Sequence, residues 1–341
     1  MFRVFATMDQ RMPLAEVADH ARRAEALGYD GLNVPEAVHD GLLASGAALA
    51  ATRRLTVATS VLVAFPRSPM TVAHAAWDLQ ASSQGRFELG LGPQVRGNIV
   101  GRYSTAWHPP VVRMREYVGA LRAIFARWQT GAPLAFEGEY YQFTRMQPFF
   151  DPGPLEAGPP PIHLGAIGPG MLALAGEVAD GLMTHPTNTV PQYLREAILP
   201  RLAVGADRAG RAHDAISVMV GGLVATGRDE TAAGEALERS RQLLGFLYST
   251  PAYWRTLELL GFEGLGPLLR ERVAEGQWND LAREIPDALL RAAVPCAPYA
   301  RIAEVLGEWY RELSGWIALP LPDDPADEPL ARRAIEQLRA G

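Results

Sequence analysis

Short apolar runs rich in β-branched residues alternate with longer amphipathic stretches from the start of the chain. The short runs predict strands, because side chains of this type pack well on the half-buried surface of a sheet. Such runs occur at residues 2–7, 31–35, 55–63, 86–91, 162–166, 181–185, 216–225 and 315–319. Strands that alternate with helices in this way are typical of parallel βα units.

The intervening stretches carry apolar residues at helical spacing. The clearest pattern covers residues 111–128, in steps of three and four, and Gly131 follows it as a helix stop. A second pattern covers residues 14–27 and ends before Gly28. Eight strands with their helices predict an α/β fold, a (β/α)8 TIM barrel. The alternative, an open doubly wound sheet, usually has fewer strands and a glycine-rich first turn.

We expect a single domain over residues 1–341 with two insertions, at about 130–161 and about 245–300, because both exceed normal loop length. The first insertion is rich in aromatic residues and proline, and the second has a helical, polar pattern. The segment PLPDDPADEP, residues 320–329, predicts a mobile linker to a short last helix.

The stretch GRFELGLGPQVRGNI, residues 85–99, raises the question of whether a nucleotide-binding turn begins at Gly90. The dinucleotide fingerprint needs a third glycine three residues after the second, and Val95 stands at that position. In a barrel, Gly90 and Gly92 would instead let another group approach the strand backbone closely at the mouth. Pro93 would then end the strand. We therefore interpret the following residues as a loop of the functional site.

The composition, 48% hydrophobic and 21% charged, allows a large core without a disulfide or metal. The lone Cys296 cannot form an internal disulfide, and no Cys/His cluster has metal-ligand spacing, so we expect no metal and a reducing compartment. The first residues do not form a signal peptide, and no apolar run approaches the roughly 20 residues of a membrane span. The expectation is a cytoplasmic protein with no membrane partner.

The chain contains no lysine, and all 32 of its Lys/Arg positions are arginine. This composition excludes Schiff-base catalysis, attachment of pyridoxal phosphate and a P-loop lysine. The net charge of −6 and the scattered arginines predict no nucleic-acid partner. Any bound anion must be held by arginine, by backbone N–H groups or by helix N-termini.

In a barrel of this kind, chemistry takes place where the strands end and the following loops begin. That criterion selects Glu36, His39, residues 60–65, residues 94–98, residues 167–170 and His185. A histidine exchanges a proton near pH 7, and a nearby carboxylate can orient its ring. Structural alternatives stay open: Glu36 could cap a helix or face solvent, His39 could cap the next helix, and Asn98 could form a turn.

Four segments carry a family resemblance: LGYDGLNVPEAVHD, LTVATSVLVAFPRSPMTVAHAAWDLQASSQGRFELGLGPQV, GPPPIHLGAIGPGMLALAGEVADG and FLYSTPAYWRTLELLGFEG. They resemble the bacterial luciferase-like flavin and deazaflavin oxidoreductases, and among these the branch that uses coenzyme F420. The similarity keeps the family's order over nearly the whole chain. It implies a (β/α)8 barrel, the fold that the strand count predicts independently.

The resemblance also implies a set of cofactor-binding residues. Ser60 and Val61 would form a bulge with a non-proline cis peptide behind the central ring of the cofactor. Asn98 would bind the pyrimidine edge of that ring. The phosphate and ribityl groups would lie near Ala166, Ile167, Gly168 and His185.

For catalysis, the resemblance implies Glu36 and His39, which here are three residues apart where the family has an adjacent pair. The predicted function is an F420-dependent oxidoreductase that transfers a hydride between the deazaflavin and a small organic substrate. The alternatives are an FMNH2-dependent luciferase-like monooxygenase, with FMN as cofactor, and a non-catalytic family member that acts as a binder or subunit. The resemblance further implies a homodimer.

Overall fold

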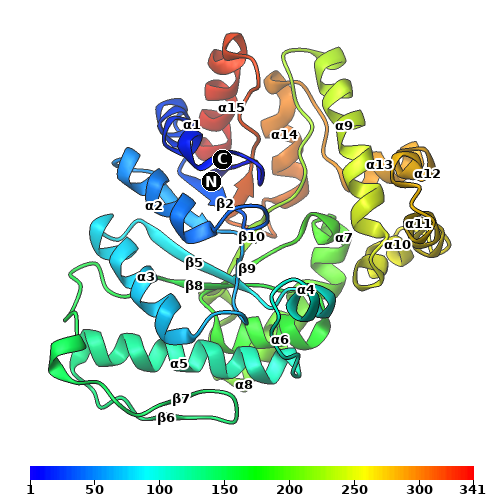
Figure 1. The fold of residues 1–341 in the computed structure, drawn as a ribbon. Helices are drawn as coiled ribbons and strands as arrows, with labels where there is room; N and C mark the ends of the chain where they lie inside the picture. Colours follow the sequence, from blue (N-terminus) through cyan, green and yellow to red (C-terminus); the bar gives the residue numbers. More distant parts are fainter.

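The computed structural model describes residues 1–341, and its main sheet closes into a parallel barrel (Figure 1). The strand order is β3-β2-β1-β11-β10-β9-β8-β5-β4, and an additional β3–β5 pairing closes the ring. Its strands are β1 (Arg3–Thr7), β2 (Gly31–Val34), β3 (Thr56–Thr59), β4 (Leu62–Val63), β5 (Phe87–Gly92), β8 (Ile162–Gly165), β9 (Gly181–Met183), β10 (Ser217–Val220) and β11 (Trp316–Ala318). Because β3 and β4 both pair with β5, they are two halves of one barrel strand. The predicted (β/α)8 TIM barrel is confirmed, and every predicted run contains a strand.

Helices cover the outside of the barrel (Figure 1). They are α1 (Leu14–Leu27), α2 (Gly41–Ala51), α3 (Pro69–Ser82), α4 (Arg96–Gly101), α5 (Pro110–Thr130), α6 (Pro169–Val178), α7 (Pro191–Tyr193), α8 (Leu199–Arg208), α9 (Glu230–Tyr248), α14 (Tyr299–Tyr310) and α15 (Glu328–Ala340). The predicted stops of α1 and α5 are confirmed, since Gly28 and Gly131 have φ of 94° and 75°. Glycine adopts this left-handed conformation without a steric penalty.

The two long stretches between barrel units have different structures. Within residues 130–161, β6 (Phe136–Glu137) and β7 (Gln142–Phe143) form an antiparallel hairpin. The second stretch is helical, as the pattern predicts. It contains α10 (Trp254–Leu259), α11 (Leu265–Ala274), α12 (Leu281–Glu284) and α13 (Asp287–Ala293). Figure 1 shows these four helices grouped with α9 at one side of the barrel, in yellow and orange.

The segment at 320–329 is not the mobile linker that its composition predicts. The Tyr29 hydroxyl donates to the Pro320 carbonyl at 2.9 Å, and Arg23 pairs with Glu328 at 2.6 Å. Arg228 also forms ion pairs with two aspartates of the segment. The helix that follows, α15, has 13 residues and packs on α14. Composition alone misses these contacts, because their arginine and tyrosine partners lie far away in the sequence.

Apolar side chains fill the middle of the barrel. Five buried residues form a separate cluster there: Phe5, Ala58, Met183, Met219 and Trp316. Phe5 and Trp316 stack with ring centres 4.5 Å apart. Gly31 on β2 makes room for this stack, since a Cβ there would lie 2.1 Å from the Phe5 ring. The stack closes the barrel below its mouth.

A polar network lies near the N-terminal ends of the strands. Glu88 accepts from Arg3 at 3.3 Å and lies 2.8 Å from the Nε2 of His163. The Arg3 guanidinium carbon is 3.8 Å from the Trp316 ring centre, so cation–π contact joins the network to the apolar cluster. Glu88 and His163 are both buried. The Glu88 carboxylate is therefore a buried group that contacts both the Arg3 guanidinium and the His163 ring.

The third barrel strand is interrupted at Ser60 and Val61, where the peptide bond is cis. The predicted position of this cis bond is thus confirmed. The Thr59 hydroxyl donates to the Gly90 carbonyl at 2.8 Å and accepts from the Gly90 N–H at 2.9 Å, so a side chain replaces ladder bonds between the strands. The Ser60 N–H donates to the Val34 carbonyl at 2.8 Å.

Glycines on the neighbouring strands leave the space that the Val61 side chain occupies. A Cβ on Gly92 would lie 2.6 Å from a Val61 methyl group, and one on Gly165 would lie 3.1 Å from the other. A Cβ on Gly90 would lie 1.9 Å from the Thr59 carbonyl oxygen. The close approach predicted for Gly90 and Gly92 is therefore made by the third strand of the barrel itself.

We expect Glu88→Ala to lower the free energy of unfolding by about 3 kcal/mol, because it removes the carboxylate that Arg3 and buried His163 share. Urea denaturation followed by tryptophan fluorescence measures this loss. The control is Glu308→Ala, at an exposed glutamate without an ion pair, which should change stability by less than about 0.5 kcal/mol. Equal losses in the two variants would contradict the structural role of Glu88.

We expect Gly92→Ala to lower the free energy of unfolding by about 1–3 kcal/mol, because its methyl group overlaps Val61 and the core must shift to admit it. Gly234→Ala is the matched control. No atom lies within 4 Å of a Cβ at Gly234, and alanine in a helix is favoured over glycine by up to about 1 kcal/mol. The idea of close packing at Gly92 fails if both variants gain stability.

Candidate active site at the barrel mouth

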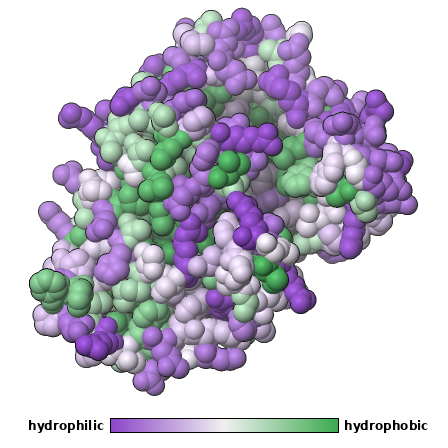
Figure 2. All heavy atoms as spheres, in the orientation of Figure 1, coloured by the Kyte–Doolittle hydropathy of each residue, from purple (hydrophilic) through white to green (hydrophobic).

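The residues predicted for the site all follow the carboxyl ends of barrel strands. Glu36 and His39 follow β2, and Ser60 follows β3. Asn98 lies in α4 after β5, and His185 follows β9. In a parallel barrel these ends share one face, so the fold gathers these residues around the mouth. Figure 2 shows the molecule hollowed between the α9–α13 helices and the rest of the barrel.

A narrow cleft enters the barrel at this face. Its lining comes from six strands and their ends: Phe5, Asn33, Ser60, Met183, Thr184, Met219, Val220, Gly221, Trp316 and Ile317. The Phe5–Trp316 stack forms part of this lining. The cleft has an apolar lining with a few polar groups, a composition typical of sites for organic ligands.

Glu36 is a buried partner of an ion pair, and its carboxylate does not face solvent. Its side chain is 5% exposed and accepts from both Arg67 terminal nitrogens, at 2.9 and 2.5 Å. It also accepts from the Val63 N–H at 2.6 Å, just beyond the cis peptide. Arg67 further pairs with Asp40 at 2.8 Å. Glu36 thus ties the loop after β2 to β4, and Arg67 is neutralised by two carboxylates.

His39 lies in the loop between Glu36 and α2 and is partly buried. The structural alternative of a capping histidine is wrong, because Asp40 is the cap of α2 and accepts from the N–H groups of Leu42 and Leu43. The same contacts, together with Arg67, lower the pKa of Asp40 against the opposing effect of burial. The His39 imidazole has no hydrogen bond to protein, and Glu36 bonds elsewhere. The two predicted catalytic residues are therefore not hydrogen-bonded to each other.

Ala166, Ile167 and Gly168 lead from β8 into α6, a helix of 10 residues. Gly168 is the N-cap and Pro169 fills the first helical position, where its missing N–H costs nothing. The N–H groups of the next two residues have no partner within the helix. Gly168, Pro169 and Gly170 are exposed, and the first turn contains no acidic residue. This helix end can accept an anion such as phosphate.

His185 is held in one orientation at the end of β9. Its Nδ1 accepts from the Thr187 N–H at 3.4 Å and lies 2.8 Å from the Thr187 hydroxyl, which places the ring proton on Nε2. Burial lowers the pKa of His185 to about 4, so the ring is neutral at pH 7. The ring stacks on Tyr253 with centres 4.5 Å apart. His185 can donate one hydrogen bond from Nε2 but cannot act as a cation at neutral pH.

Asn98 is partly buried within α4, and its side chain makes no hydrogen bond to protein. Its backbone carbonyl accepts from the N–H groups of Arg102 and Tyr103, which ends the short helix. Arg102 in turn donates to the Ala37 carbonyl, so α4 is joined to the loop that carries His39. The Asn98 amide is therefore available to a ligand, and its role in ring binding stays a prediction.

Two residues of the mouth are absent from the predicted set. Asn33 is the one polar residue among the four of β2, a signal visible in the sequence GLNV. Thr184 accepts from the Gly221 N–H at 3.0 Å and donates to the Met219 carbonyl at 3.2 Å, which joins the ends of β9 and β10. Nothing in the sequence around Thr184 indicates this contact, because it depends on the register of the barrel.

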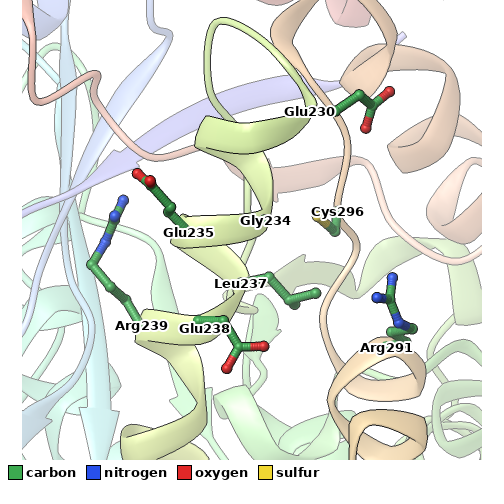
Figure 3. Close-up of a pocket in the computed structure, with 8 residues that line it drawn as sticks. All are labelled: Glu230, Gly234, Glu235, Leu237, Glu238, Arg239, Arg291 and Cys296. Carbon is green, nitrogen blue, oxygen red and sulfur yellow. The ribbon is translucent and has the colours of Figure 1, made fainter.

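A wider hollow lies along α9 and shares no lining residue with the cleft at the barrel mouth (Figure 3). Figure 3 shows charged side chains of both signs on α9, with Arg291 and Cys296 across from them. The Cys296 thiol donates to the Ala233 carbonyl at 3.5 Å, and burial raises its pKa. A thiol with a raised pKa is a poor nucleophile, so this hollow has no evident chemistry.

No helix of the structure combines the length and the apolar character needed to cross a membrane. Among curated proteins, the chain is 41% identical over 293 residues to an uncharacterised protein of Mycobacterium tuberculosis, which covers 86% of each chain. It is 33% identical over 217 residues to the F420-dependent glucose-6-phosphate dehydrogenase of Nakamurella multipartita, covering 60% of this chain and 62% of the relative.

Among solved structures, the coenzyme F420-dependent tetrahydromethanopterin reductase of Methanopyrus kandleri superposes with a TM-score of 0.81. The superposition covers 99% of both chains at 18% sequence identity, so it shows a common fold. The model of the luciferase-like monooxygenase family matches residues 1–315. That match covers the whole barrel except its last strand and the final helix. The chain therefore belongs to the luciferase-like monooxygenase family of oxidoreductases.

Proposed function

We propose that this protein is an F420-dependent oxidoreductase that transfers a hydride between the deazaflavin and a small organic substrate. The observation that carries the proposal is the similarity to an F420-dependent dehydrogenase and to the fold of an F420-dependent reductase. The barrel mouth supports it, because the apolar cleft and the free N-terminus of α6 lie at the same end of the barrel.

The residues of the mouth fit such a cofactor. Met183 and Met219 offer an apolar, polarisable lining for a flat ring, with Val61 packed against their cluster. The N–H groups at the start of α6 suit a phosphate in a chain that has no lysine. When bound, the deazaflavin supplies a carbon atom that gives or takes a hydride. The protein supplies orientation and a site shielded from water.

The chain's own residues divide into positioning and proton-transfer roles. Glu36 is saturated by Arg67 and the Val63 N–H, so we assign it to holding the loop beside the mouth. His39 has no protein partner, so a nitrogen of its imidazole can take or give the proton that accompanies hydride transfer. His185, neutral and fixed, orients bound groups through its Nε2–H.

A reduced-FMN monooxygenase is the second candidate function, and the description of the matching family favours it. Both candidates would place the cofactor at the barrel mouth. They differ in their need for O₂, because only the monooxygenase consumes it. Cofactor preference measured without O₂ therefore separates them.

We expect anaerobic titration with coenzyme F420 to quench the fluorescence of the seven tryptophans and to saturate at micromolar concentrations, with much weaker binding of FMN. The reason is that the mouth offers an apolar lining and an anion site, and one of the relatives is an F420-dependent dehydrogenase. Tighter binding of FMN would favour the monooxygenase. Absence of binding by either compound would contradict both, and would favour a family member without catalytic activity.

We expect His39→Ala to lower turnover of reduced F420 by about 10²–10⁴-fold with little change in the Kd of F420, because a general acid–base group is lost while the binding residues remain. The assay is anaerobic oxidation of reduced F420 by a panel of aldehydes, ketones and imines, using whichever compound the wild type reduces. The control is His213→Ala, at an exposed histidine paired with Asp207 after α8. Unchanged turnover in His39→Ala would place the proton transfer elsewhere.

A further inference from the structure

Asn33 has an unpartnered polar atom at the centre of the molecule. It lies on β2 between Leu32 and Val34, which face the main core, so its own side chain faces the barrel interior. The residue is 7% exposed, and its Oδ1 has no hydrogen-bond partner. The only bond of its amide is a long one, 3.5 Å from Nδ2 to the Thr7 hydroxyl. Buried polar atoms are usually paired, so such an exception in a cleft indicates a missing partner.

The cleft beside Asn33 limits what that partner can be. Ser60 lines the same cleft, and its hydroxyl has no hydrogen bond to protein. The remaining lining is apolar or already paired, as Thr184 is, and it contains no charged side chain. The space left inside measures about 10 Å³, which is close to the volume that one water-sized group needs. The space inside the cleft therefore admits the end of a small uncharged group.

We propose that Asn33 is a ligand-binding, specificity-determining residue, whose Oδ1 accepts a hydrogen bond from an uncharged O–H or N–H group that enters the cleft beside Ser60. An ionised group is disfavoured, because the cleft has no opposite charge to pair with it. Glu36 and Arg67, which lie in the loops after β2 and β4, neutralise each other. The inference rests on the proposed function in one respect, that the ligand enters by the barrel mouth.

The donor could belong to the cofactor or to the substrate, and nuclear magnetic resonance can distinguish these sources. The chain has four asparagines, at positions 33, 98, 188 and 279, so ¹⁵N-asparagine labelling gives four side-chain amide pairs. Asn33→Asp and Asn98→Asp assign two of them. A shift of the Asn33 amide on addition of F420 alone places the donor on the cofactor. A shift only when glycerol is then added, as an uncharged hydroxyl probe, places it on the substrate.

No shift of the Asn33 amide with F420, FMN or glycerol would overturn the inference, and a permanently bound water would then be the missing partner. Tryptophan quenching by F420 in the same sample reports the proposed function separately, so the two can fail independently. Asn98 is the internal comparison, because its amide is partly exposed at the mouth and should respond to a bound ring.

A substitution supplies the second measurement. Asn33→Leu keeps the shape and removes the amide, and we expect it to weaken binding of the molecule that shifts the Asn33 resonance by about 10- to 100-fold. The melting temperature should stay equal or rise, since the variant removes an unpaired buried atom. A lower melting temperature with unchanged affinity would mean that Asn33 has only a structural role. Asn279→Leu, at the short turn before α12, is the control for both measurements.

Discussion

The packing of Val61 against two neighbouring strands is the constraint on which the barrel mouth depends. The third barrel strand stops at Thr59 and resumes at Leu62, and the residues between them turn toward the barrel axis. Space for the Val61 side chain exists only because Gly92 and Gly165 have no Cβ. A larger residue at either position would require Val61 or the backbone around it to shift. The glycines of the GLG sequence thus serve packing between strands.

Arginine side chains form several of the contacts that join separate elements of this fold. Arg86 donates to the carbonyls of Leu49, Thr52 and Leu55, where a helix ends and a strand begins. Arg113 donates to the Phe65 carbonyl and to the Tyr141 hydroxyl, which joins α5 to the loop after β4 and to the hairpin region. A planar group with five donors suits such shared contacts. These two guanidinium groups are engaged by the protein and are therefore not free to hold a bound anion.

The sequence predicted the barrel well, because alternation of short apolar runs with helical patterns depends on local spacing alone. It also located the break at Ser60 through a family resemblance, where the pattern of 55–63 by itself reads as one strand. The failures involve partners distant in sequence. Glu36 meets Arg67, which lies 31 residues further on, and the segment at 320–329 meets Arg23 and Arg228. The sequence alone does not single out Asn33, because one polar residue in an apolar strand has many ordinary explanations.

α9 and the helices after it contact the barrel mouth at the loop that follows β9, which carries His185 and Thr187. The Thr187 carbonyl accepts from the hydroxyls of Tyr248 and Thr256, at 3.4 and 2.6 Å, and His185 stacks on Tyr253. These three residues come from α9, α10 and the turn between them. A change of sequence in these helices can therefore move His185 without touching the barrel strands. Under the proposed function, this arrangement would let the barrel keep its cofactor contacts while the added helices adapt the mouth to a substrate, because function varies in loops on a rigid scaffold.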